Sequence, residues 1–321
     1  MNDQMSYTSA NSMPGKLLSE KEIFIKNNKI IPAHIQLCPT NKCNLNCSFC
    51  SCSEREREEE FEFRDLLKYI YMFKKLGTLA VTITGGGEPC CYKYLEGVIE
   101  TFHTNNISVG LVSNGLLLGK VRKEVLSLLT WCRVSFSDDR EVDKLLPVLE
   151  NIVPEAHTDW AFSYVVTRKF NEANCKETIN FANKYNFTHV RLVSDILDAE
   201  NTLPLSVIGR TFLDEDFDDS KVIYQPRDKY TKGSKKCYIS LLKPVLAADG
   251  WLYPCCGAQY AIEGSEGFFP EQLRMCKIKD SKEYFESQKI FDGSICDKCY
   301  YQDYNNVLGM MMETYDHKEF V

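Results

Sequence analysis

The sequence predicts an α/β fold in which about six parallel strands are followed by a second, smaller unit. Three observations support this prediction. Short runs rich in β-branched residues alternate with amphipathic segments of helical period between residues 34 and 200. The chain then becomes acidic and irregular over residues 198–236. Finally, six of the 15 cysteines fall within residues 237–321.

These changes in composition divide the chain into four expected segments. Residues 1–20 are rich in Ser, Asn and Met, which is typical of a flexible leader. Two short apolar runs flank Asn27-Asn28 within Glu22–Ile31 and predict a small hairpin. The expected segments are a leader with this hairpin (1–33), the alternating α/β region (34–200), a linker (201–236) and a cysteine-rich unit with a C-terminal helix around Met310-Met311-Met312 (237–321).

The alternating region is expected to contain six strands, each bounded by turn residues. They are Ala33–Leu37, Leu79–Thr84, Ile107–Val112, Trp131–Phe136, Ala161–Val166 and His189–Val193. Apolar residues at helical spacing predict the intervening helices. These run from Phe63 to Gly77, around Leu95–Phe102, and over Val121–Leu129, Glu141–Leu149 and Glu172–Tyr185. Such alternation implies right-handed crossovers in a barrel or an open sheet, and the region is too short for eight repeats.

Composition excludes several classes of protein. The net charge of −7 offers no basic stripe for duplex nucleic acid. No apolar run is long enough to span a bilayer, and the N-terminus shows no secretory signal. An odd number of cysteines in such a chain indicates metal ligands or reactive thiols rather than a disulfide scaffold. We therefore expect a cytoplasmic protein. The charged run Glu54–Glu60 is interpreted as a solvated loop or helix start.

Three cysteines share one loop after the first predicted strand of the alternating region. Cys43, Cys47 and Cys50 form a Cys-x3-Cys-x2-Cys array, close enough for three thiolates to converge on one metal centre. Iron–sulfur cubanes usually have four cysteine ligands, so three leave one iron open to another ligand. A structural zinc site with a distant fourth ligand is the alternative, although such sites usually show paired Cys-x2-Cys knuckles.

The loop resembles the signature of the radical S-adenosylmethionine (SAM) superfamily, including an aromatic residue, Phe49, directly before the third cysteine. The resemblance implies a partial (β/α)6 barrel and a [4Fe–4S] cluster whose open iron binds SAM. It also implies that reduction, by a partner such as flavodoxin or ferredoxin, releases a 5′-deoxyadenosyl radical that takes a hydrogen atom from substrate. Phe49 would then lie near the adenine.

Further candidates for SAM contacts follow the next predicted strands. Gly85-Gly86-Gly87-Glu88-Pro89 has backbone that a ligand can approach closely, and it resembles the motif that contacts the SAM amino group in this superfamily. The polar residues Ser113, Asn114 and Ser135 suit ribose or carboxylate contacts, with ordinary turn chemistry as the alternative. Arg168 can pair with the SAM carboxylate or be solvated. Ser135 sits within the fourth strand, and the cysteine loop, the glycine motif, Ser113-Asn114-Gly115 and Arg168 fall at carboxyl ends of expected parallel strands, where ligands gather in α/β folds.

A second set of cysteines lies in the C-terminal unit. An Asp249-Gly250 turn between two short strands is expected to bring Cys255 back near Cys237, and Cys296 and Cys299 add a second pair. Four thiolates can ligate a cubane or a tetrahedral zinc ion. The spacing resembles the twitch domain, a short form of the SPASM extension of radical SAM enzymes, which implies one auxiliary [4Fe–4S] cluster. Cys256 and Cys276 leave the ligand set uncertain by one residue.

The substrate is less constrained than the cofactors. If the substrate radical is quenched by a hydrogen atom, the cysteine candidates are Cys90, Cys91 and Cys256, although cysteines also pack as small apolar residues. The resemblance favours a ribosomally made peptide, modified by crosslinking, epimerisation or excision and bound directly or through a separate recognition protein. The alternative within the family is a small polar metabolite such as an aminosugar. The alternative from another class is a non-enzymatic zinc or iron–sulfur module.

Overall fold

The structure is a computed structural model that describes residues 15–214, 217–227, 230–265, 267, 269–313 and 316. The expected leader lies mostly outside these residues. No helix in the described ranges is both long enough and apolar enough to cross a membrane.

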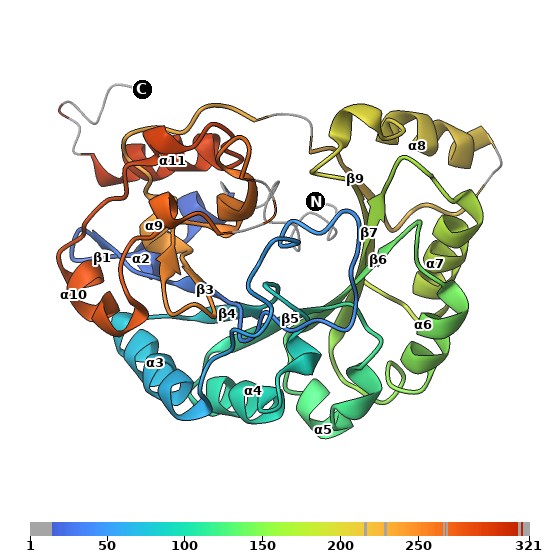
Figure 1. Cartoon of the computed structure of the whole chain (residues 1–321), viewed down its shortest axis with the longest axis horizontal. Helices are drawn as coiled ribbons and strands as arrows, with labels where there is room; N and C mark the ends of the chain where they lie inside the picture. The colour runs from blue at the N-terminus through green and yellow to red at the C-terminus, as the bar shows by residue number, and fades with distance from the viewer. Residues whose placement is uncertain are drawn as a thin grey trace.

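The central element is a nine-stranded sheet with the order β11-β10-β3-β4-β5-β6-β7-β8-β9 (Figure 1). Every neighbouring pair in it is parallel except β10 and β11. The strands are β3 (His34–Leu37), β4 (Ala80–Ile83), β5 (Ser108–Ser113), β6 (Trp131–Ser137), β7 (Asp159–Val166), β8 (His189–Ser194), β9 (Val222–Gln225), β10 (Val245–Leu246) and β11 (Leu252–Tyr253). The predicted α/β fold with parallel strands is therefore confirmed.

Helices form an outer layer around the curved sheet (Figure 1). Those that connect the strands are α3 (Phe63–Leu76), α4 (Leu95–Thr104), α5 (Lys123–Leu126), α6 (Val142–Glu150), α7 (Glu172–Lys184) and α8 (Leu205–Asp214). The remaining helices are α2 (Lys21–Phe24), α9 (Ile239–Leu242), α10 (Ser281–Glu286) and α11 (Gln302–Met312). The predicted helix from Phe63 is confirmed, and it ends where Gly77 adopts a φ of 99°.

Alternation along the strands separates an apolar outer face from a polar inner face. In β6, Cys132, Val134 and Phe136 are buried in the core shared with the helices. The intervening residues include Arg133 and Ser135, which therefore face the interior of the barrel. The same alternation holds in β8 and β3. The inner face is thus lined with polar side chains, as a ligand site requires.

Two predicted hairpins are confirmed. β1 (Ile25–Lys26) and β2 (Lys29–Ile30) are antiparallel, and both turn residues between them, Asn27 and Asn28, have positive φ. The second is the β10–β11 pair around Asp249-Gly250. Because β10 also pairs in parallel with β3, the C-terminal unit continues the sheet of the barrel.

The structure corrects the expectation of an irregular linker over residues 201–236. This segment contains α8 and β9, and β9 extends the sheet by pairing in parallel with β8. Leu205, Ile208 and Phe212 are buried at helical spacing, so an amphipathic pattern was present within acidic surroundings. The division of the chain into domains stays a prediction.

Gly110 offers a test of packing on the inner face. A Cβ at this position would lie 2.1 Å from the Trp131 indole, so we expect Gly110→Ala to lower the free energy of unfolding by about 1–3 kcal/mol through overpacking. Denaturant unfolding measures the change. Gly119→Ala is the matched control, because its nearest neighbour lies 3.5 Å away. In a Trp131→Ala background, Gly110→Ala should cost nothing, and an undiminished cost there would contradict this account.

Candidate functional site

The cysteine loop and the glycine loop cross in direct backbone contact. The cysteine loop runs from β3 to α3, and the glycine loop follows β4. The amide of Gly87 donates to the Thr40 carbonyl over 2.8 Å, and the amide of Glu88 donates to the Lys42 carbonyl over 2.8 Å. A Cβ on Gly87 would lie 2.0 Å from the Lys42 carbonyl oxygen. Glycine is therefore required here, because the two backbones leave no room for a side chain.

The three thiols of the cysteine loop are partly buried. Burial raises the pKa of the Cys47 thiol, and nearby Arg140 opposes this effect, while Cys50 and Cys43 add to it. The three cysteines therefore interact electrostatically. Within the described ranges, no three His, Cys, Asp or Glu side chains are grouped to hold a single metal ion. Cysteines on one cubane bind different irons, so their sulfurs are spaced more widely than ligands of one ion.

Arg55 supports the cysteine loop from inside. Its Nε donates to the Asn41 carbonyl over 2.8 Å, and its Nη1 lies 3.7 Å from the Cys50 sulfur. The side chain is only 8% exposed. The interpretation of Glu54–Glu60 as a solvated loop or helix start is therefore corrected. Arg55, which lies in this run, is buried and stabilises the cysteine loop.

Glu88 ties the glycine loop to the end of β5. Its buried carboxylate accepts hydrogen bonds from the Ser113 hydroxyl (2.7 Å), the Asn114 amide (2.6 Å) and the Cys90 amide (3.0 Å). The Asn114 side chain in turn donates to Asn44 Oδ1 in the cysteine loop over 2.7 Å. The structure thus brings together three of the candidate residues, Glu88, Ser113 and Asn114. The Ser113 hydroxyl already donates a hydrogen bond to Glu88.

Arg140 is the functional candidate that the sequence analysis missed. It follows β6, its Nη2 donates to the Asn114 carbonyl over 2.6 Å, and its Nη1 contacts the Ser135 carbonyl. Burial lowers the pKa of its guanidinium, an effect opposed by Cys47, Glu88 and Cys43. A cation therefore stands between the ends of β5 and β6 and close to the cysteine loop. In the sequence, the only sign of this residue was its place at the end of the polar run Ser137-Asp138-Asp139-Arg140.

Arg168 is placed differently from its predicted role. Its guanidinium pairs with Asp198 through two hydrogen bonds, one of them 2.9 Å long, and its side chain is 63% exposed. Asp198 raises the pKa of Arg168. Of the other candidates, Phe49 is half-buried in the cysteine loop, and Ser135 lies on the inner face of β6.

The four predicted cysteines of the C-terminal unit line one pocket. Cys237, Cys255, Cys296 and Cys299 surround it together with glycines and tyrosines. Backbone hydrogen bonds support the ligand candidates: the Gly257 amide donates to the Cys255 sulfur over 3.3 Å. The two spare cysteines do not line this pocket. The Cys256 sulfur lies 3.1 Å from the Tyr301 hydroxyl, and burial raises the pKa of Cys276 to about 11.

The three candidate hydrogen donors occupy different surroundings. Cys90 lies 3.6 Å from the Ser113 hydroxyl, and burial raises the pKa of its thiol well above the ordinary value. Cys91 lies beside Asn44 in the cysteine loop. Cys256 interacts electrostatically with Arg133 and Lys243, whose positions place it toward the interior of the barrel.

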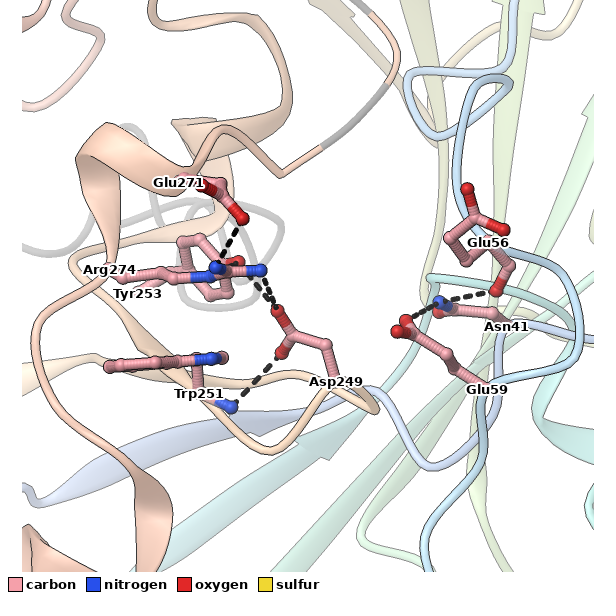
Figure 2. Close-up of polar contacts among 8 residues, drawn as sticks. All are labelled: Asn41, Glu56, Glu59, Asp249, Trp251, Tyr253, Glu271 and Arg274. Carbon is pink, nitrogen blue, oxygen red and sulfur yellow. Dashed lines mark hydrogen bonds and ion pairs between the residues drawn. The ribbon is translucent and has the colours of Figure 1, made fainter.

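Polar residues of the cysteine loop face the β10–β11 hairpin of the C-terminal unit (Figure 2). Asn41 Nδ2 donates to the Glu59 carboxylate over 3.0 Å, and on the facing side the Tyr253 hydroxyl donates to Asp249 over 2.8 Å. Burial raises the pKa of Glu59, and Asp249 adds to the increase. The amide of Glu54 also donates to the Gly267 carbonyl over 2.9 Å. The C-terminal unit therefore helps to hold the cysteine loop.

Comparison with known proteins agrees with this geometry. Residues 37–136 match the family model described as Radical SAM superfamily. The chain is 25% identical over 288 residues to GTP 3′,8-cyclase of Helicobacter pylori, covering 78% of this chain and 88% of that protein.

Solved structures share the fold at low sequence identity. SuiB of Streptococcus suis bound to S-adenosylmethionine is 14% identical with a TM-score of 0.56, covering 94% of this chain and 80% of that one. SuiB bound to its precursor peptide SuiA has the same identity and TM-score, with coverages of 88% and 79%. The structure of anSMEcpe with bound AdoMet and Cp18Cys peptide is 13% identical with a TM-score of 0.51, covering 90% and 85%.

The matched region contains both loops that cross at the rim of the barrel. The part of the chain that carries both loops is therefore similar to the radical SAM superfamily, a family of enzymes that use a [4Fe–4S] cluster and S-adenosylmethionine, and the chain shares its fold with SuiB.

Proposed function

We propose that this enzyme modifies a ribosomally synthesised peptide by taking a hydrogen atom from it. When bound, the cluster and SAM supply the 5′-deoxyadenosyl radical for this chemistry. The observation that carries the proposal is the crossing of the three-cysteine loop and the glycine loop at the carboxyl ends of parallel strands. The match of residues 37–136 to a family of enzymes favours this proposal over a non-enzymatic metal module.

The donor set at the rim fits the cluster that the family uses. Cys43, Cys47 and Cys50 supply three thiols from one loop, which leaves one iron for SAM. Their protons must leave when iron binds, and the nearby cation Arg140 favours the thiolate form of Cys47.

We assign the SAM carboxylate to Arg140 in place of Arg168. The Arg140 guanidinium is partly buried beside the cysteine loop, whereas Asp198 already pairs with that of Arg168. The glycine-loop backbone is proposed for the SAM amino group, Asn114 and Ser135 for the ribose or carboxylate, and Phe49 for the adenine.

The C-terminal pocket fits an auxiliary [4Fe–4S] cluster. Its four lining cysteines form a complete donor set, and Cys256 and Cys276 lie outside that lining. Four cysteine ligands would leave such a cluster no position for substrate, so we propose that the chemistry it would supply when bound is to accept an electron from the substrate radical, whose proton would pass to a base.

The proposal of a peptide substrate is supported by two structures with the same fold. SuiB is solved with its precursor peptide and anSMEcpe with a cysteine-containing peptide, and both share the fold of this chain. A small polar metabolite is the second candidate, favoured by the similarity to a protein named for a nucleotide substrate.

The first test removes the rim cluster. We expect Cys43→Ala/Cys47→Ala/Cys50→Ala to abolish formation of 5′-deoxyadenosine from SAM under reducing, anaerobic conditions. Iron content should fall from about eight to about four atoms per chain, because the C-terminal cysteines are unchanged. Chromatography of the nucleoside and iron and sulfide analysis provide the readouts. Continued cleavage of SAM by the triple variant would refute the assignment.

The second test removes one ligand of the auxiliary cluster. Cys299→Ala should lower the iron content by about four atoms while SAM cleavage continues, because the rim cluster stays intact. Cys276→Ala is the matched control, since that cysteine lies outside the pocket lining, and it should keep all its iron. Loss of iron in Cys276→Ala but not in Cys299→Ala would reverse the ligand assignment.

The third test compares the two arginines. Arg140→Met should weaken SAM binding by about 10- to 100-fold, the effect of losing a charged hydrogen bond worth about 1.5–3 kcal/mol. Arg168→Met should leave the affinity within about twofold of wild type, because an exposed ion pair contributes little. Equilibrium dialysis of the reconstituted protein with labelled SAM measures both. The reverse order would return the carboxylate to Arg168.

A further inference from the structure

Two arginines project from the inner face of the barrel. Arg133 in β6 and Arg191 in β8 alternate with residues of the hydrophobic core, so both face the interior. In the strand register, Arg191 of β8 pairs with Ser163 of β7. Arg133 of β6 pairs with Ala161 of β7, which in turn pairs with His189 of β8. The two guanidinium groups are therefore neighbours on one surface.

Arg191 is buried and Arg133 is partly buried, and neither has full hydrogen bonding among the described residues. Arg191 is 9% exposed, and its Nη2 donates to the Ser163 hydroxyl over 2.9 Å. The Nε atoms of both Arg133 and Arg191 are buried and make no hydrogen bond within the described part of the chain. A buried donor without a partner is costly, so a group that accepts from it is expected to bind there.

Two further cations gather at the same place. Arg227 and Lys243 act electrostatically on the buried arginines, and Lys243 itself is partly buried. Burial, together with the nearby charge of Arg227, lowers the pKa of Arg133 to about 10. Among the described residues, no ion pair joins any of these four cations to a carboxylate.

The side chains that interact with these four cations include thiols and phenols. Cys256 and Tyr301 interact with Arg133, and Tyr260 interacts with Arg227. Neither type of side chain is ordinarily charged at neutral pH, so they do not neutralise the cations. Several like charges in a partly desolvated interior repel one another. An anion bound there reduces this repulsion and also accepts hydrogen bonds from the unpaired Nε atoms.

We propose that the part of the substrate that enters the barrel carries an oxyanion, either phosphate or carboxylate, and that Arg133, Arg191, Arg227 and Lys243 bind it. This rests on the proposed function, because it names a chemical feature of that enzyme's substrate. Guanidinium groups bind both oxyanions in bidentate fashion. A peptide would supply an acidic side chain or its terminal carboxylate, and a metabolite would supply a phosphate.

Arg133 and Arg191 are separate residues from the proposed SAM carboxylate site. Arg191 lies three residues before the end of β8 at Ser194, and Arg133 lies four residues before the end of β6 at Ser137. At the usual rise per residue in a strand, their Cα atoms are roughly 10–13 Å from the carboxyl ends of these strands, whereas the Arg140 side chain descends from the loop after β6.

The test measures anion binding and SAM cleavage separately on the reconstituted enzyme with both clusters. Pyrophosphate and glutarate are the probes, titrated calorimetrically at constant ionic strength in the presence of SAM. Wild type should bind at least one of them, and the preferred probe identifies phosphate or carboxylate. Arg191→Gln and Arg133→Gln should each weaken binding at least tenfold, whereas Arg191→Lys should retain part of it.

Arg122→Gln is the control, because Arg122 is an exposed arginine paired with Glu96 and Glu100. It should bind the probe as wild type does. Formation of 5′-deoxyadenosine without substrate should be unchanged in every variant, which also shows that each one folds. Failure of wild type to bind either probe, or wild-type affinity in both glutamine variants, would overturn the inference. Absence of 5′-deoxyadenosine from wild type would instead overturn the proposed function.

Discussion

The site depends on two stretches of backbone that pass each other with no room for a side chain. Gly86 and Gly87 lie against residues 40–42, and two hydrogen bonds of 2.8 Å join the segments. This contact fixes the start of the cysteine loop to the end of β4. Glu88, the next residue, then reaches the end of β5, and Arg140 joins the ends of β5 and β6. Three neighbouring loops are thereby held in one arrangement at the rim before any cofactor binds.

The two sets of cysteines differ in their surroundings as well as in their number. Three lie in a partly exposed loop that Arg55 supports from beneath and the C-terminal unit supports from the side. Four line a pocket within the C-terminal unit. On the inner face of the barrel, Arg133 and Arg191 have buried Nε atoms without hydrogen-bond partners among the described residues, and Arg133 interacts with Cys256 and Tyr301.

Much of the fold was predictable from the sequence because its strands and helices have clear periods. All six expected strands and the helix that ends at Gly77 are present, since their apolar faces pack in one core. α8 and β9 were missed because acidic neighbours masked a short apolar pattern. The close spacing of Cys43, Cys47 and Cys50 was visible because these residues are local in sequence. Arg140 could not be selected, because its role depends on contacts with residues of two other strands. The inner-face arginines were visible as the polar half of an alternating pattern, but their proximity depends on strand register.

The central claim is that one chain holds an open three-cysteine cluster and a closed four-cysteine cluster. Diffraction from crystals of the anaerobically reconstituted protein, recorded on both sides of the iron absorption edge, tests it most directly. The account predicts two iron peaks per chain, one contacted by Cys43, Cys47 and Cys50 and one by Cys237, Cys255, Cys296 and Cys299. A fourth protein ligand at the first peak, or a zinc signal in place of iron at either position, would contradict it.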